Sequence, residues 1–212
     1  MNRSEIRNLV VENTRRTDKT ALINSAINIA VAELSSQRLW MDLQTEAELT
    51  TTASVASVEL PSDYNRLVEA RLVVAGSNYL SRTIQIYPKT WVVKHYPNPE
   101  NIAAGKPTLG YLEGTRLFLV PYPDDVYTLR ITYFRLHPAL ASDADTVLIR
   151  HGNQAVVAYA TAWTFRAIEK HQDAAEWMNT YAQLLSTAKQ VDTDNSAINR
   201  VAEPRGESVP LV

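Results

Sequence analysis

The sequence predicts an α+β fold in which N- and C-terminal helices form a helical bundle around an inserted, antiparallel β-rich domain. Near both ends, apolar residues recur at three- and four-residue steps, whereas between about residues 45 and 140 the period falls to two and β-branched, aromatic, Pro and Gly residues accumulate. The 212 residues include no cysteine, and a chain of this length can bury its own core without disulfides. We expect the bundle over residues 1–44 and 141–194, the β-rich domain over 45–140 and an extended C-terminal arm over 195–212.

Two helices are predicted before the β-rich domain. The first covers residues 4–14, with Ser4 as its N-cap. The second follows Asp18, which we expect to cap it, and ends near Trp40. Its apolar stripe comprises Leu22, Ile23, Ala26, Ile27, Ala30, Val31 and Leu34.

Strands are predicted at residues 55–60, 69–75, 80–87, 108–112, 115–120 and 127–136. In the last of these, Leu129, Ile131 and Tyr133 alternate with polar residues, as in a sheet with one solvated face. Glu113-Gly114 suits a hairpin turn, and residues 76–78 suit a second turn. Pro88 is expected in the first turn of a short helix that runs through Val92.

After residue 143 the helical period returns as two apolar stripes, and a break near His171 predicts an antiparallel helical hairpin. Trp163, Trp177 and Tyr181 lie on these stripes, so we expect them in the core or at a subunit interface. Trp40 is a further core or interface candidate, although its place near a helix end, like that of Trp91, favours exposure. No cofactor-binding tryptophan is expected.

From Asn195 the periodicity ends, and Pro204, Gly206 and Pro210 disfavour a helix. The predicted arm nevertheless carries apolar side chains that are too sparse to form a core. These candidate anchors are Ile198, Val201, Val209, Leu211 and Val212.

The composition excludes several classes of function. The absence of cysteine excludes thiolate metal sites and a thiol nucleophile. The 21 Lys and Arg against 23 Asp and Glu give a net charge of −2, which argues against a protein that mainly neutralises phosphates. The charged N-terminus and the lack of a long apolar run predict a protein made in the cytoplasm, without a membrane segment.

The motifs that carry chemistry are weak. Gly105-Lys106 does not fit a phosphate-binding loop, since Pro107 stands where Ser or Thr is needed. Asp124-Asp125 are adjacent carboxylates that could serve acid–base chemistry, but their Pro-rich context favours a turn. Asp143 and Asp145 are expected as helix caps. The four histidines, at 95, 137, 151 and 171, are far apart in sequence, so no metal, cofactor or catalytic site is predicted.

Several short motifs follow one another in an informative order. They are residues 22–28 leading to Leu39-Trp40, then Leu60-Pro61-Ser62-Asp63-Tyr64, Gly105-Lys106-Pro107 with Tyr111, Leu119-Val120-Pro121-Tyr122-Pro123, and Trp177 with Tyr181. In this order, over about residues 18–190, they resemble the head-to-tail adaptor (connector) proteins of tailed bacteriophages.

The resemblance implies a virion structural protein, made in the host cytoplasm and located in the neck of the virion. It implies a homo-oligomeric ring, usually of about twelve copies, between the portal protein and a downstream tail or nozzle protein. DNA would pass through the lumen without specific binding. The C-terminal arm would dock on the portal.

Two alternatives stay open at this point. A tail-associated binding module could contact a tail protein or a surface glycan through an aromatic patch around Trp91, Tyr96 and Tyr111. A cell-wall hydrolase could use Asp124 or Asp125.

Overall fold

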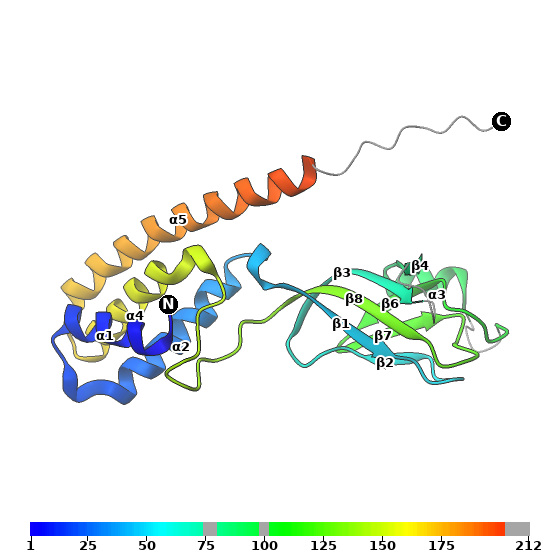
Figure 1. The fold of residues 1–212 in the computed structure, drawn as a ribbon, viewed down its shortest axis with the longest axis horizontal. Coiled ribbons are helices and arrows are strands. Elements are labelled where there is room, and N and C mark those ends of the chain that lie inside the picture. The colour runs from blue at the N-terminus through cyan, green and yellow to red at the C-terminus, as the bar shows by residue number, and fades with distance from the viewer. Residues whose placement is uncertain (74–79, 98–101, 202–212) are drawn as a thin grey trace. The chain divides into compact units, whose positions relative to one another are not determined.

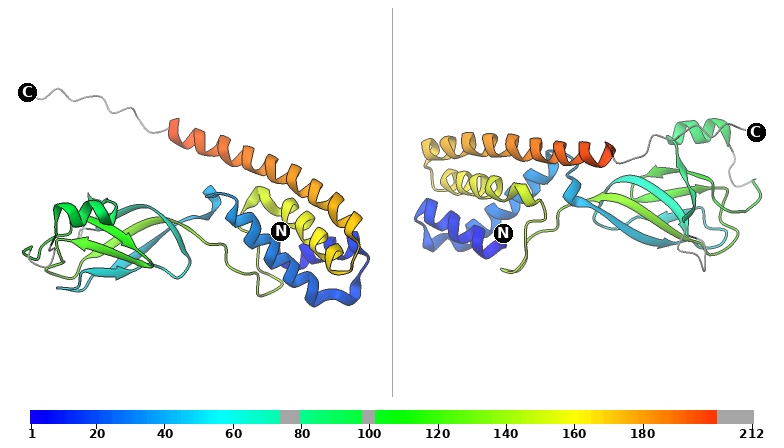
Figure 2. Two further views of the ribbon diagram at one scale, coloured as in Figure 1. Left: turned by 180° about the vertical axis from the view of Figure 1, so that it is seen from behind. Right: turned by 45° about the horizontal axis from the view of Figure 1, so that its top comes forward.

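The computed structural model describes residues 1–73, 80–97 and 102–201 (Figures 1 and 2). The chain divides into two compact units. The first comprises residues 1–43 together with the residues from His137 onward, and the second comprises residues 44–136. Helices make up the first unit and two sheets make up most of the second, so the predicted α+β class is confirmed.

The helical unit is built around one nearly buried helix. Its elements are α1 (Arg3–Thr14), η1 (Thr17–Lys19), α2 (Thr20–Ser36), η2 (Met41–Leu43), η4 (Arg150–Gly152), α4 (Asn153–Ala167) and α5 (His171–Val201). Helices α1, α2 and α5 all pack against α4. Because it is covered on several sides, α4 buries residues all round, including Val156, Thr161 and Phe165. Helices α4 and α5 form the predicted helical hairpin (Figure 2).

The helix caps differ from those predicted. Asn2, not Ser4, caps α1: its side chain accepts a hydrogen bond from Glu5 N (2.8 Å), and Glu5 Oε2 accepts one from Asn2 N (3.0 Å). This capping box satisfies two backbone N–H groups at the start of the helix. It therefore favours a helix that begins directly after Asn2. Asp18 does not cap α2, because it lies in η1 and pairs with Arg16 at 2.8 Å.

Asp143 and Asp145 were also expected as helix caps, and this is wrong because α4 begins only at Asn153. The Asp143 carboxylate instead accepts hydrogen bonds from Arg3 and Arg7, each at 2.7 Å. These guanidinium groups hold the pKa of Asp143 well below its usual range. Asp145 Oδ2 accepts from Ala141 N (2.7 Å) and Ser142 N (2.8 Å), so both carboxylates order the loop that returns to the helical unit.

Helix α5 continues to Val201, so the predicted change to extended chain at Asn195 is wrong for residues 195–201. The first proline comes only at position 204, and nothing before it prevents a helix. The C-terminal half of α5 is fixed to the segment after α2. There, Arg38 donates to Lys189 O (2.8 Å) and lies 2.9 Å from the Asp192 carboxylate, which also accepts from Met41 N (3.0 Å).

The second unit contains two four-stranded sheets. One has the order β1 (Gln44–Thr50), β8 (Thr128–Arg135), β3 (Tyr64–Val73), β4 (Leu80–Thr83), and the other has the order β2 (Ser57–Glu59), β7 (Arg116–Val120), β6 (Leu109–Glu113), β5 (Gln85–Ile86). All neighbouring strands are antiparallel except β5 and β6, which are parallel. The short helix α3 (Lys89–His95) follows β5 and has Pro88 as its N-cap.

The core of this unit confirms the predicted alternation in its last strand. Leu129, Ile131 and Tyr133 are buried with residues of both sheets, such as Leu72 and Leu117. The predicted hairpin turn is also present, and Gly114 there has a φ of 58°, which favours glycine. The second predicted turn, at residues 76–78, lies outside the described residues.

Candidate interaction site

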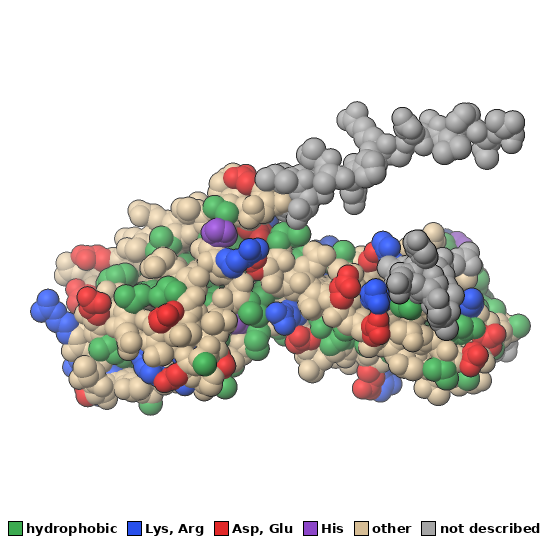
Figure 3. Space-filling view, viewed as in Figure 1, with side chains coloured by type: hydrophobic (Ala, Val, Ile, Leu, Met, Phe, Trp, Pro, Cys, Tyr) green, Lys and Arg blue, Asp and Glu red, His purple; other side chains and the backbone are tan. Residues whose placement is uncertain are grey.

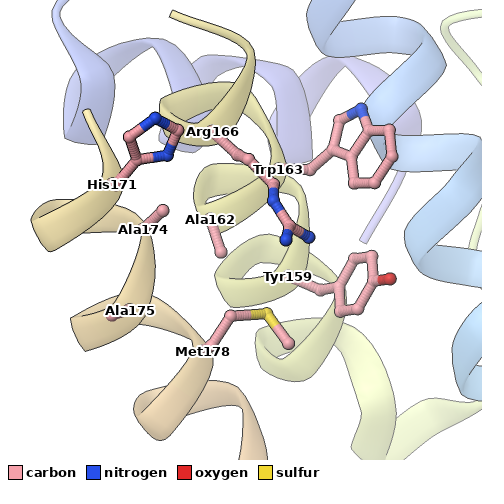
Figure 4. A pocket seen from close by; sticks show the side chains of 8 residues that line it. All are labelled: Tyr159, Ala162, Trp163, Arg166, His171, Ala174, Ala175 and Met178. Atoms are coloured by element: carbon pink, nitrogen blue, oxygen red, sulfur yellow. The ribbon is translucent and has the colours of Figure 1, made fainter. Parts of the chain in front are cut away.

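A groove runs along the hairpin of α4 and α5 (Figure 4). Helix α4 contributes Tyr159, Ala162, Trp163 and Arg166, and α5 contributes His171, Ala174, Ala175 and Met178. The three alanines leave a cavity of about 260 Å³ between the larger side chains. Met178 is 42% exposed, which is high for a large apolar side chain.

The residue types in this groove are typical of protein interfaces. Trp, Tyr, Met and Arg are enriched there, and acidic residues are depleted from interface cores. Arg166 forms no ion pair with any residue in the described part of the chain, and Figure 4 shows its side chain extending along α4 toward Tyr159. The groove thus offers apolar walls and one cation without a counter-ion.

The wall of the groove rests on a rigid aromatic pair. Tyr159 contacts Tyr181 edge to face, with ring centroids 5.0 Å apart. Tyr181 is only 6% exposed, and burial raises its pKa to about 12. Burial also raises the pKa of Tyr159, so both phenols stay neutral at physiological pH. The predicted core or interface candidate Tyr181 therefore lies in the core behind the groove.

The three predicted tryptophans have different environments. Trp163 forms part of the groove, whereas Trp177 is partly buried against the helical core and lines a second pocket with Arg15 and Lys170. Trp40 is buried, and its Nε1 donates a hydrogen bond to Leu34 O (2.8 Å). The structure therefore places Trp40 in the core of the helical unit, and the expectation of exposure is wrong because the indole bonds back to the last turn of α2.

The predicted arm anchors are described only in part. The backbone at Ile198 and Val201 belongs to α5, while Val209, Leu211 and Val212 lie outside the described residues. Their role in docking stays a prediction.

Asp124 and Asp125 lie in an acidic turn, which we define as residues 121–126. Asp124 accepts a hydrogen bond from the Tyr127 hydroxyl (2.7 Å), and Asp125 Oδ1 accepts one from Val126 N (2.7 Å). The bond to Asp124 raises the pKa of Tyr127 to about 12. Both carboxylates are exposed and bonded to groups of the same segment, so this arrangement has the features of a turn.

The expected aromatic patch is largely packed against itself. Trp91 stacks with Tyr87 and with His95, each at a centroid distance of 4.1 Å. Two rings cannot share one face of an indole at that distance, so both faces of Trp91 are covered. Tyr96 and Tyr111 pack beside them on a small core of Val92, Leu109 and Val120.

The described histidines have different local contacts. Leu148 N donates to His137 Nε2 (2.8 Å), and His95 stacks on Trp91. Within the described ranges, no three His, Asp or Glu side chains are grouped as metal ligands. No helix in those ranges is both long and apolar enough to cross a membrane.

Sequence reasoning assigned Trp163 correctly to an apolar stripe but missed the groove itself. Tyr159 and Arg166 lie four residues before and three after Trp163 and so share its face of α4. That spacing was the available signal. Whether α5 would cover this face or leave it open depends on tertiary packing, which periodicity does not reveal.

Comparison with known proteins adds the following. The family model described as "SU10 adaptor protein" matches residues 1–203. No curated protein matches the chain.

Proposed function

Because the chain belongs to the SU10 adaptor family of phage head-to-tail adaptor proteins, we propose that it forms a ring of about twelve copies between the portal and the tail. The observation that carries this proposal is the family match, which extends through both units of the chain. In this role the protein joins two larger assemblies and has no cofactor.

The partners we propose are a second copy of the chain, the portal protein and a downstream tail or nozzle protein. Two separately folded units suit a protein that must hold two partners, since each unit can offer its own surface. The apolar residues 198 and 201 at the end of α5, together with 209, 211 and 212 beyond it, would dock on the portal.

DNA would pass through the lumen of the ring without specific binding. The chain carries a net charge of −2, and Figure 3 shows acidic and basic side chains interspersed over the visible face. Interspersed charges of both signs bind the DNA backbone weakly, and this would let DNA slide.

Neither alternative gains support from the structure. A glycan-binding platform needs an open aromatic face, and both faces of Trp91 are covered by Tyr87 and His95. A wall hydrolase would need a second group near Asp124 or Asp125 to shift a carboxylate pKa, and the hydrogen-bond partners described for these side chains are the Tyr127 hydroxyl and Val126 N.

The test is to image the purified protein alone and mixed with the portal protein of its phage, by mass photometry and negative-stain microscopy. The free chain should be largely monomeric, because each contact between ring neighbours is weak until the portal fixes the curvature. Rings should appear on the portal. A chain that neither binds the portal nor forms rings on it would overturn the proposal.

A further inference from the structure

The groove between α4 and α5 is too small to hold a helix. Its volume of about 260 Å³ is below the range of about 300–1,000 Å³ that is usual for small-molecule sites. It can accept one or two side chains from a turn. Because Arg166 lacks an ion-pair partner among the described residues, the best occupant combines an apolar side chain with a carboxylate.

The acidic turn of the second unit has that chemistry. Val126 is 60% exposed, the most of any large aliphatic side chain in the described ranges, and it directly follows Asp124 and Asp125. Neither carboxylate forms an ion pair with a described residue. By contrast, Val68 adjoins Glu69, which is already paired with Arg71, and Val93 adjoins Lys94.

The turn is also held in one conformation before any partner arrives. Thr51 N donates to Tyr127 O (2.9 Å), Tyr127 N donates to Thr51 Oγ1 (2.8 Å), and Ser54 N donates to Pro123 O (2.8 Å). A preorganised turn loses little conformational entropy on docking. Val126 and its carboxylates are therefore presented as a rigid projection.

We propose that the acidic turn of one copy docks in the α4–α5 groove of a second copy, with Val126 against Met178 and Trp163 and with Asp124 or Asp125 near Arg166. The two surfaces belong to different units and differ from each other, so the contact is head to tail and can repeat from copy to copy. This inference rests on the proposed ring, for which it names the contact between neighbours.

Cysteine cross-linking tests the contact directly, because the chain has no cysteine of its own. A protein with V126C and M178C should form covalent dimers and longer ladders under mild oxidation, since a disulfide needs the two Cα atoms within about 7 Å. A mixture of the two single variants should stop at the dimer, because each chain then has one thiol. The matched control carries V93C with M178C, since Val93 is an exposed valine of the same unit (48%).

Charge reversal then tests the chemistry of the contact. Arg166→Glu in the V126C/M178C background should lower the cross-linking rate by about tenfold or more, and adding D124K and D125K should restore part of it. Equal rates for the V126C and V93C pairs, or a disulfide that closes only within one chain, would overturn the inference.

The outcome is separable from that of the proposed function. Rings on the portal that give no 126–178 cross-link would reject this contact and leave the adaptor role intact. Head-to-tail ladders from a chain that does not bind the portal would reject the adaptor role and retain the contact.

Discussion

Individual carboxylates order parts of this protein. Asp143 illustrates this, since it joins Arg3 and Arg7 of α1 to the loop that returns from the second unit. Asp143→Asn should lower the melting temperature at neutral pH. The folded-state pKa is lowered, so the carboxylate stabilises the fold above the unfolded-state value of about 3.9 and loses that effect as the pH falls through the folded-state pKa.

Differential scanning fluorimetry from pH 2.5 to 7 measures this effect. The gap in melting temperature between the wild type and D143N should narrow below about pH 4. Asp18→Asn is the comparison. The pKa of Asp18 is lowered by its hydrogen bond with Arg16, but its partners Arg16 and Lys19 are exposed neighbours in the sequence, so the same narrowing should be much smaller. A gap that stays constant over this pH range would show that ionisation of Asp143 is not its cause.

Glycine positions give a second prediction. A Cβ at Gly110 would overlap the carbonyl oxygen of Phe118 in the neighbouring strand β7, and that backbone cannot move without disturbing the sheet. Gly110→Ala should therefore lower the free energy of unfolding by about 1–3 kcal/mol in urea titration. At Gly105 a Cβ would make an ordinary contact of 3.6 Å with Pro121. Gly105→Ala should therefore change the free energy of unfolding by less than about 0.5 kcal/mol. Similar values for both variants would contradict this account.

Among the elements, α5 depends on the contacts of its C-terminal half. Asp192→Ala would remove the carboxylate that faces Arg38 and Met41 N, and the loss should cost about 1–3 kcal/mol. Amide hydrogen exchange should become faster around residues 188–195. Asp194→Ala, which loses only a contact with Gln190 on the same helix, should leave exchange nearly unchanged. Equal protection in the two variants would mean that packing alone holds the helix.

The sequence allowed long periodic elements to be predicted well and their ends poorly. Strand β8 and the hairpin of α4 and α5 have strong hydrophobic periodicity. The start of α1 was harder to predict, because both Asn2 and Ser4 are suitable N-cap residues and the sequence does not show which of them caps the helix. Strand β1 was not predicted as a separate strand. Its sequence QTEAELT is half-exposed and has few β-branched residues, and its pairing with β8 comes from a segment about 80 residues away.

For the whole molecule, the main signal in the sequence is the change of period between about residues 45 and 140, because burial in a sheet and burial in a helix leave different patterns. The groove could not be predicted, since it depends on how α5 lies across α4.

The C-terminal arm remains a prediction. Deleting residues 202–212 should leave thermal unfolding of the free chain nearly unchanged while weakening binding to the portal, as measured by biolayer interferometry. If the truncated chain binds the portal as tightly as the full chain, the helical unit makes the contact with the portal.

The pairing of β1 with β8 has a consequence for how such a protein can change over generations. Gln44, where the chain passes into the second unit, lies opposite Phe134, two residues before the unit ends. Paired residues of antiparallel strands are about 5 Å apart, so a two-residue linker can close the gap. Recombination at these two points would replace residues 44–136 as one cassette and leave the helical unit intact.

A gene with that segment replaced by Gly-Gly should still encode a helical protein that melts cooperatively, which circular dichroism would show. A different second unit could thus be acquired in a single exchange.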